Sequence, residues 1–223
     1  LTTADVHIMP LILYGMQASG PCRTVLLAAK ALNLELDIKP IDMRQGDHLK
    51  PEYLKLNPQH TIPTLVDDGF SIWESRAIIT YLANKYGKGS SLYPEDPKAR
   101  ALVDQRLYFD MGTLYSSFSD YFYPQIFFGQ PADDEKKTKV ESALKFLDMF
   151  LEGQTYVAGD NLTVADLSLV ATVSNLEASD IDFKKHANIK RWYEKVQKTA
   201  PGYKEANQDG LDAFIEFIKA TKK

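Results

Sequence analysis

Residues 11–32 read LILYGMQASGPCRTVLLAAKAL, and this stretch decides the fold of the first part of the chain. The apolar run at residues 11–14 ends at Gly15, as a buried strand ends at a turn. Pro21 then stands where proline is tolerated, in the first turn of a helix, and helix-forming residues continue to about Leu32. The stretch therefore predicts a strand, a loop and a helix.

The next segments extend this pattern. Residues 34–41 alternate apolar and charged side chains, which is typical of a strand with one face in water. Residues 51–56 leave room for only a turn or two of helix. Asp67-Asp68-Gly69 then separates two short apolar runs and favours a hairpin turn. Ser75 can begin a further helix, so the predicted element order is βαβαββα.

The richest concentration of glycine, serine and proline lies at residues 87–97 and predicts a domain boundary. Helical periodicity dominates the rest of the chain. Helices are expected at about 98–127, 133–152, 163–178, 187–198 and 210–220, the first with a kink near Pro124. We therefore expect an α/β domain over residues 1–87, a linker over 88–97 and an all-α helical domain over 98–223.

The composition excludes several classes of protein. Of 223 residues, 44% are hydrophobic and 25% charged, as in globular domains, and no apolar run approaches the roughly 20 residues that span a membrane. A net charge of −4 supplies no general attraction for nucleic acid. The single cysteine, Cys22, cannot form an internal disulfide, and residues 1–10 lack the features of a secretory signal. A cytoplasmic protein is expected.

The loop Ser19-Gly20-Pro21-Cys22 has the form of the thioredoxin redox motif Cys-Gly-Pro-Cys, with serine in place of the first cysteine. Dithiol chemistry is thereby lost. A serine hydroxyl at a helix N-terminus can instead donate to a thiolate, which a ligand must supply. Taken alone, Ser19 is better explained as an ordinary helix cap, and Cys22 as a small buried hydrophobic residue.

Longer motifs extend this observation. Residues 19–23 (SGPCR), 57–65 (NPQHTIPTL) and 73–78 (WESRAI) together resemble the cytosolic glutathione transferases of insects, of the delta class. The likeness continues through residues 106–115 (RLYFDMGTLY) and 162–167 (LTVADL), so it covers nearly the whole chain. Gln17-Ala18 departs from the Pro-Gly that is usual in the delta class, and residues 13–16 (LYGM) are similar to the epsilon class. The resemblance implies a thioredoxin-like N-terminal domain.

The resemblance also implies a glutathione site, with Ser19 as the catalytic residue. A cis peptide before Pro63 is expected to present the Ile62 backbone to the cysteinyl part of the tripeptide. Ser75 is expected to bind the γ-glutamyl carboxylate, and Glu74 the free amine. Arg76 is expected to support that carboxylate or to hold Glu74. The residues expected to bind glutathione are His48, His60, Ile62, Pro63, Glu74, Ser75 and Arg76.

Histidines and aromatic residues complete the expected site. His48 and His60 resemble the two family histidines that face the glycyl end of glutathione. No histidine pair at metal-ligand spacing accompanies carboxylates, so neither a metal nor another cofactor is expected.

Aromatic side chains recur on one face of the first long helix. Alone they are more often core packing, but the family places an apolar substrate pocket there. The expected pocket residues are Met16, Tyr115, Phe118, Phe122, Tyr123, Ile126, Phe127 and Phe214, and Phe217 is expected to help close the pocket.

One further motif is interpreted as structural. Thr163 and Asp166 form a capping box with aspartate in the usual place of glutamate, and Leu162 and Leu167 stand where a hydrophobic staple places its two residues.

The sequence thus predicts a glutathione transferase that is a homodimer and joins glutathione to small hydrophobic electrophiles, or eliminates chloride from chlorinated ones. Two alternatives remain: a non-catalytic binder of hydrophobic ligands on the same fold, and a thiol oxidoreductase that uses Cys22.

Overall fold

The structure is a computed structural model and describes residues 10–221. The expectation about a signal in residues 1–10 therefore concerns a segment that, apart from Pro10, lies outside the described residues.

The first part of the chain has the predicted element order βαβαββα. Its elements are β1 (Leu11–Gly15), α1 (Gly20–Ala31), β2 (Leu36–Pro40), the 3-10 turn η1 (Asp47–Leu49), α2 (Pro51–Leu54), β3 (Thr64–Asp67), β4 (Phe70–Trp73) and α3 (Ser75–Tyr86). In the hairpin between β3 and β4, Asp68 and Gly69 both have positive φ angles, of 49° and 79°. This is the primed turn that an Asp-Gly pair favours, so the predicted hairpin is confirmed.

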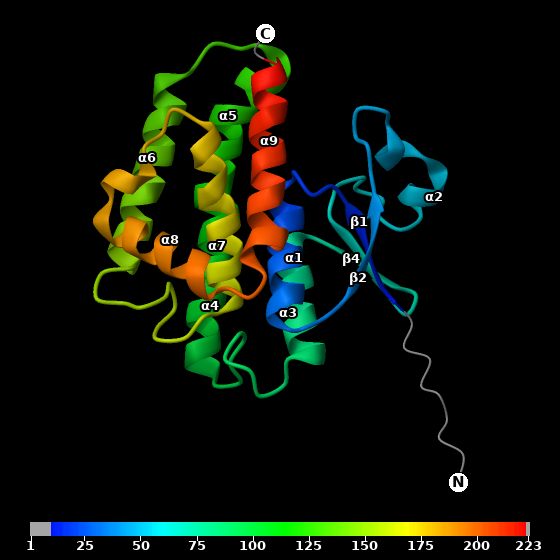
Figure 1. Ribbon diagram of the computed structural model, residues 1–223, viewed down its shortest axis with the longest axis horizontal. Coiled ribbons are helices and arrows are strands. Elements are labelled where there is room, and N and C mark those ends of the chain that lie inside the picture. The colour runs from blue at the N-terminus through cyan, green and yellow to red at the C-terminus, as the bar shows by residue number, and fades with distance from the viewer. Residues whose placement is uncertain (1–9, 222–223) are drawn as a thin grey trace.

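The four strands form one mixed sheet in the order β2-β1-β3-β4. β1 runs parallel to β2 and antiparallel to β3, and β3 runs antiparallel to β4. Figure 1 shows α1 and α3 between this sheet and the bundle of later helices, with α2 on the far side of the sheet. α1 also packs against α7 (Val164–Asn175), which makes it the bridge between the two halves.

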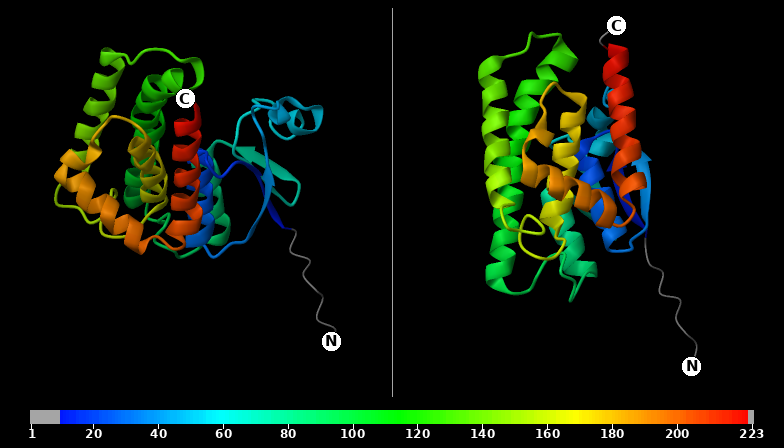
Figure 2. Two further views of the ribbon diagram at one scale, coloured as in Figure 1. Left: turned by 45° about the horizontal axis from the view of Figure 1, so that its top comes forward. Right: turned by 60° about the vertical axis from the view of Figure 1, so that its left-hand side comes forward.

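The second part of the chain is helical, as predicted. Its elements are α4 (Pro97–Phe109), η2 (Asp110–Tyr115), α5 (Ser116–Phe128), α6 (Asp134–Phe150), α7 (Val164–Asn175), η3 (Leu176–Ala178), η4 (Phe183–Lys185), α8 (Ala187–Thr199), η5 (Lys204–Gln208) and α9 (Asp209–Thr221). The left view in Figure 2 shows these helices on one side of α1 and α3, with the sheet on the other. The single helix expected at 98–127 is divided, because a π-helical turn, η2, separates α4 from α5.

Helix α7 lies at the centre of the helical half, and every one of its residues is buried. Its N-terminus carries the predicted capping box, in which the Asp166 carboxylate accepts from the Thr163 backbone N–H at 2.9 Å. The same carboxylate also accepts from the Val157 N–H and from Nε1 of Trp192, both at 2.8 Å. Asp166 therefore joins the start of α7 to a preceding loop and to α8.

Candidate active site

Strand register brings three of the predicted segments to one end of the sheet. Tyr14, near the end of β1, pairs with Thr64, the first residue of β3. Thr64 in turn pairs with Trp73, the last residue of β4. Three segments therefore meet at the same end of the sheet: the loop after β1, the residues before β3 and the residues after β4. These segments carry Ser19, Ile62–Pro63 and Glu74–Ser75.

Ser19 lies at the N-cap position of α1 with extended backbone angles (φ −73°, ψ 123°). Its side chain forms no capping hydrogen bond to the helix backbone. Ser19 therefore occupies the N-cap position, but its hydroxyl does not cap the helix. An interaction of this hydroxyl with the Cys22 thiol acts to lower the pKa of the thiol. The hydroxyl is thus free of the backbone at the positive end of a helix, where an anion is favoured.

Cys22 is 1% exposed and lies one turn into α1. Burial raises the pKa of its thiol to about 11, so the thiol is neutral at physiological pH. A Cβ on Gly15 would lie 2.6 Å from the Cys22 sulfur, which shows how closely the end of β1 packs on this side chain. A buried, neutral thiol is a poor nucleophile, and this argues against redox chemistry at Cys22.

The Ile62–Pro63 peptide bond is cis, as expected. Asn57 holds this loop, because its Nδ2 donates to the Thr61 carbonyl at 2.9 Å and to Oγ1 of Thr64 at 3.0 Å. Within residues 10–221 the Ile62 backbone takes part in no hydrogen bond, so its N–H and C=O remain available to a ligand. Asn57 was given no role from the sequence, although this residue begins the motif that carries the cis proline.

His48 lies in η1, before α2, and His60 in the loop after α2, and their ring centroids lie 6.0 Å apart. Nδ1 of His48 is buried and has no hydrogen-bond partner among the described residues. His60 is exposed and has a positive φ of 47°. Two imidazoles thus meet on one side of the loop that carries the cis proline, and a buried ring nitrogen without a partner is typical of a place that a ligand completes.

Glu74 and Ser75 form the junction of β4 and α3. Glu74 is exposed and has φ 68°, a left-handed conformation that costs free energy for a residue with a side chain and is often found at functional sites. Ser75 is only 3% exposed and is the first residue of α3. The turn therefore places a carboxylate beside a hydroxyl at a helix N-terminus, a pair that can bind an amine and a carboxylate.

Arg76 connects this junction to the helical half. Its Nη1 donates to the Ser75 hydroxyl oxygen at 2.9 Å, and its Nη2 donates to Oδ2 of Asp110 at 2.8 Å. Asp110 is fully buried and also accepts from the Ser168 hydroxyl. Arg76 forms no hydrogen bond with Glu74, so the structure does not support the alternative that it holds Glu74. Because Ser75 accepts from Arg76, its own O–H is left to donate to a ligand.

Comparison with known proteins decides the family. The family described as "Glutathione S-transferase, N-terminal domain" matches residues 13–91, and "Glutathione S-transferase, C-terminal domain" matches residues 111–199. The chain belongs to the glutathione S-transferase family.

Solved structures of insect enzymes are similar over almost the whole length of this transferase. A delta-class glutathione transferase of Nilaparvata lugens is 56% identical, with 95% of this chain and 100% of that chain covered and a TM-score of 0.93. A glutathione transferase of Bombyx mori is 46% identical, with coverages of 94% and 98% and a TM-score of 0.91. An epsilon-class enzyme of the housefly, Musca domestica, is 42% identical, with coverages of 95% and 98% and a TM-score of 0.89.

The aromatic residues predicted to face a substrate divide into two groups. Phe118 and Phe122 are 0% and 3% exposed, and their rings stack at 5.1 Å. Ile126 and Phe214 are buried as well, and the ring of Phe214 lies 6.4 Å from that of Phe122. All four side chains thus lie mainly inside the protein, and their place in a substrate site stays a prediction.

The other predicted members have accessible surface in the transferase. They are Met16, Tyr115, Tyr123 and Phe127. The hydroxyls of Tyr115 and Tyr123 lie 3.3 Å apart, and the Arg76 guanidinium lies 5.0 Å from the centre of the Tyr115 ring. Tyr115 therefore contacts the group that holds Ser75. No single-sequence pattern would have revealed this contact, because the two side chains come from different halves of the chain.

A cation–π contact spans the two halves at the far end of α9. The guanidinium of Arg44, in the loop after β2, lies 4.2 Å from the centre of the Phe217 ring. Phe217 was expected from the sequence to help close the pocket, whereas Arg44 was given no role. The contact ties α9 to the N-terminal domain beside the loop that carries His48.

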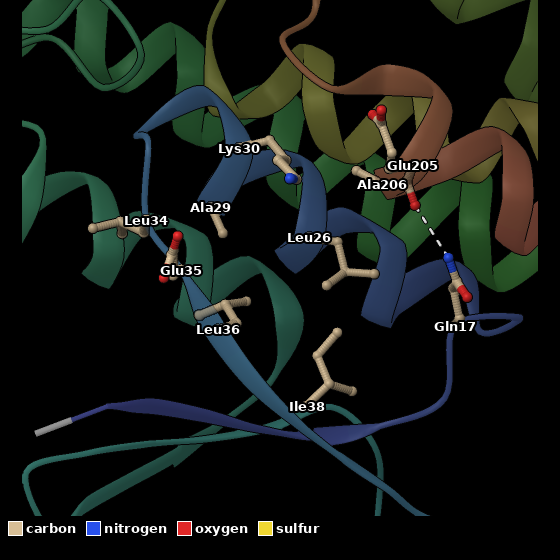
Figure 3. A pocket seen from close by; sticks show the side chains of 10 residues that line it. All are labelled: Gln17, Leu26, Ala29, Lys30, Leu34, Glu35, Leu36, Ile38, Glu205 and Ala206. Atoms are coloured by element: carbon tan, nitrogen blue, oxygen red, sulfur yellow. Dashed lines mark hydrogen bonds between the residues drawn. The ribbon is translucent and has the colours of Figure 1, made fainter.

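A separate cavity of about 360 Å³ lies between α1, β2 and η5 (Figure 3). Its lining residues are Gln17, Leu26, Ala29, Lys30, Leu34, Glu35, Leu36, Ile38, Glu205 and Ala206, none of which was predicted to bind a substrate. Nε2 of Gln17 donates to the Glu205 carbonyl at 3.1 Å across its edge. The loop of Ser19 is thereby attached to the segment that precedes α9.

Residues 10–221 contain neither a candidate metal site nor a membrane-spanning helix. No group of three or more histidine, cysteine, aspartate or glutamate side chains is placed to hold a metal ion. None of the helices in this part of the chain is long and apolar enough to cross a membrane.

Proposed function

We propose that this transferase attaches the glutathione sulfur to small hydrophobic electrophiles, and that the Ser19 hydroxyl donates a hydrogen bond to the thiolate. The observation that carries this proposal is a hydroxyl at the N-terminus of α1 that caps no backbone group. A free thiol with a pKa of about 8.5 is only a few per cent ionised at pH 7, so about two units of lowering make the thiolate the major form. A hydroxyl donor and a helix N-terminus act in that direction.

In this proposal the tripeptide lies across the end of the sheet where the segments after β1, before β3 and after β4 meet. Ser75 and the N-terminus of α3 bind the γ-glutamyl carboxylate, and Glu74 binds the amine. The free backbone groups of Ile62, beside Pro63, pair with the cysteinyl part. His48 and His60 face the glycyl end. The unpartnered Nδ1 of His48 and the free donor of Ser75 support this orientation.

Arg76 acts as a support for Ser75 and not as a first contact of the tripeptide. Three of its four guanidinium hydrogen bonds, of 2.8 to 3.2 Å, reach Ser75 and Asp110, and Asp110 has no exposed surface. A buried carboxylate thus fixes the arginine, and the arginine fixes the serine. Such a chain of hydrogen bonds keeps the carboxylate site ordered before glutathione arrives.

The acceptor site lies beside Met16 and Tyr115, with Tyr123 and Phe127 farther along α5. An apolar site with few polar groups suits hydrophobic electrophiles. With a chlorinated acceptor the same thiolate can remove a proton from one carbon while chloride leaves the next, which gives an alkene, chloride and regenerated glutathione. We include this elimination as a second reaction of the site.

We also propose that the transferase is a cytoplasmic homodimer. Support for the dimer comes from exposed apolar side chains on one helical surface: Tyr108 is 70% exposed and Met111, one turn later, is 42% exposed. A single, buried cysteine is compatible with a reducing compartment. The proposed domains are residues 1–87 and 98–223, with α3 ending at Tyr86 and α4 beginning at Pro97.

Turnover of a chloronitrobenzene with glutathione tests the proposal. The parent enzyme should form the conjugate, and Ser19→Ala should lower kcat at pH 7 at least about tenfold while glutathione still binds. Bound glutathione without turnover in the parent would favour the non-catalytic binder. A mixed disulfide between Cys22 and glutathione would favour the oxidoreductase.

A further inference from the structure

Arg23 is a fully buried cation in the first turn of α1. Its side chain is 0% exposed, and its backbone N–H donates to the Ser19 carbonyl at 2.9 Å. Burial lowers the pKa of the guanidinium from its ordinary value, but arginine remains protonated in proteins at neutral pH. The residue that follows Ser19 by one helical turn therefore carries a permanent positive charge, and this charge acts to lower the pKa of the neighbouring Cys22 thiol.

The hydrogen-bond partners of this cation are neutral. Nη1 donates to the Ser174 hydroxyl at 2.9 Å and to Oδ1 of Asn207 at 2.7 Å, and Nη2 donates to Oδ1 of Asn175. Nε has no partner, and no carboxylate forms an ion pair with Arg23, among residues 10–221. Two asparagines thus occupy positions where aspartates of nearly the same size would neutralise the charge.

The ionisable groups around Arg23 do not compensate it either. They are Cys22 on α1, Tyr123 on α5, Tyr193 on α8 and Tyr203 before η5. Burial raises the pKa of each of these groups, so all four are neutral at pH 7.

Acidic groups on the neighbouring elements have other partners. Glu177, after α7, interacts with Tyr193 and forms an ion pair with Lys184 at 3.1 Å. On α7 itself, Asp166 lies at the opposite end from Ser174 and Asn175. Glu205 and Asp209 lie in and beside η5 at the surface, and Asp209 forms an ion pair with Lys204 at 2.8 Å. α3, the remaining neighbour of α1, carries no acidic residue.

Two glycines allow the chain to close around this cluster. A Cβ on Gly20 would lie 2.6 Å from Nδ2 of Asn175. A Cβ on Gly210 would lie 2.3 Å from the Gln17 carbonyl oxygen and 2.8 Å from Cδ of Arg23. The backbone on both sides thus packs directly onto the cluster. In such a dry environment a charge acts over a longer distance than in water.

We propose that Arg23 is an electrostatic element of the transferase reaction: its uncompensated charge adds to the N-terminus of α1 and favours the thiolate of bound glutathione over the thiol. The inference rests on the proposed role of Ser19. Leaving a buried charge without an ion-pair partner lowers stability, so a purely structural tether between α1, α7 and η5 would be better served by aspartate at position 175 or 207. Two neutral asparagines at these positions are explained if the positive charge of Arg23 is kept uncompensated for the reaction.

Asn207→Asp separates the two roles, because it places a carboxylate next to the guanidinium without removing Arg23. The thiolate absorbance of bound glutathione, titrated against pH, should give a pKa that is higher by about 0.5 to 1 unit than in the parent, which is roughly three- to tenfold less thiolate well below the pKa. The midpoint of denaturation should stay the same or rise. A structural tether would give that stability gain and leave the thiol titration unchanged.

Asn84→Asp is the matched control, because it adds the same charge at an exposed position near the C-terminal end of α3. It should leave the thiol pKa within about 0.2 unit. Affinity for S-methylglutathione, which has no ionisable thiol, should be nearly equal in the parent and in Asn207→Asp. If Asn207→Asp does not fold, Arg23→Lys and Arg23→Met provide the comparison: the lysine variant should keep the lowered thiol pKa better than the methionine variant.

The outcomes distinguish this inference from the proposal on which it rests. A parent enzyme that leaves the thiol pKa of glutathione at about 8.5 contradicts the proposed function itself. A lowered pKa in the parent that Asn207→Asp leaves unchanged contradicts only the role of Arg23. A rise in Asn207→Asp that is matched by Asn84→Asp also contradicts it, because the effect would then follow the net charge of the protein.

Discussion

Ser19 and Cys22 occupy neighbouring positions around one turn of α1, but their surroundings give them opposite chemistry. The Ser19 hydroxyl is half-buried and caps no backbone group, whereas the Cys22 thiol is enclosed and its pKa is raised by burial. A sequence motif gives the order of these two residues but not the exposure of each. The loss of the first cysteine from the thioredoxin motif is thus accompanied by the burial of the second.

Replacement of Cys22 tests its structural role. Cys22→Ala should keep kcat within about twofold and lower the free energy of unfolding by about 1 kcal/mol, because only a small buried group is removed. The folded-state pKa of the thiol is raised from 9.0 to about 11, so the unfolded chain ionises first and stability falls as pH rises from about 9 to 11. Denaturation of parent and variant across this pH range should show a smaller fall in the variant. Loss of turnover in Cys22→Ala would return the thiol to the mechanism.

The γ-glutamyl end of the tripeptide provides a second test at single residues. Ser75→Ala and Glu74→Ala should each raise the KM for glutathione, since a charge-assisted hydrogen bond contributes about 1.5 to 3 kcal/mol. The KM for the electrophile should change less. Calorimetry with glutathione measures the affinity directly, and Ser91→Ala, at an exposed serine between α3 and α4, is the control. Normal glutathione binding by both variants would show that the carboxylate and amine lie elsewhere.

Single residues whose partners lie near in sequence were predictable, and those with distant partners were not. The cis bond before Pro63 follows from a local motif. Arg23 instead contacts Ser174 and Asn207, which lie 151 and 184 residues along the chain. Asp110 lies 34 residues from Arg76, and no pattern in either segment indicates that they meet.

At the scale of elements, the start of α7 depends on one carboxylate. Thr163→Ala should lower the free energy of unfolding by about 1 kcal/mol, as loss of a cap does. Asp166→Ala should cost about 3 kcal/mol or more, because it also leaves the buried donors of Val157 and Trp192 without an acceptor. Glutathione affinity should stay nearly unchanged in both variants. Equal denaturation midpoints for the two variants would contradict the role of Asp166 as a hub.

Element type was easier to predict than element continuity. The hairpin at Asp68-Gly69 and the capping box at Thr163 are specified by a few adjacent residues, and both were predicted. The π-helical turns Asp110–Tyr115 and Lys204–Gln208 were not, because one extra residue in a turn scarcely changes the spacing of apolar side chains. The first of these turns begins at Asp110 and ends at Tyr115, both of which contact Arg76.

The same limit applies to the aromatic residues of α5. Phe118 and Phe122 lie on one face with Tyr115, and helical spacing cannot distinguish a face that packs inside the protein from one that borders a pocket. The structure buries the rings of Phe118 and Phe122, and their place in a substrate site stays a prediction.

At the scale of the whole molecule, the two halves meet through buried polar groups on both sides of the proposed site. Arg23 extends from α1 to α7 and the segment before α9, and Arg76 extends from α3 to η2 and α7. Both arginines belong to the N-terminal half, and their partners belong to the helical half. Each therefore couples the order of a glutathione-binding segment to the packing of the two domains.

The proposed dimer gives a prediction at this scale. Tyr108→Glu should raise the dimer dissociation constant at least about tenfold, because it places a charge in a surface that association would bury. Sedimentation velocity over a range of concentrations measures the effect, with Tyr86→Glu, on α3, as a control at another partly exposed tyrosine. A parent protein that sediments as a monomer at micromolar concentration would contradict the dimer.

The pKa of the glutathione thiol bound to this transferase is the most direct test of the account. Thiolate absorbance titrated against pH should give a pKa about two units below 8.5 in the parent enzyme and a value near 8.5 in Ser19→Ala, while both proteins still bind the tripeptide. The variant should remain folded, because Ser19 makes no capping hydrogen bond that the substitution could remove. The same low pKa in parent and variant would remove the Ser19 hydroxyl from the mechanism.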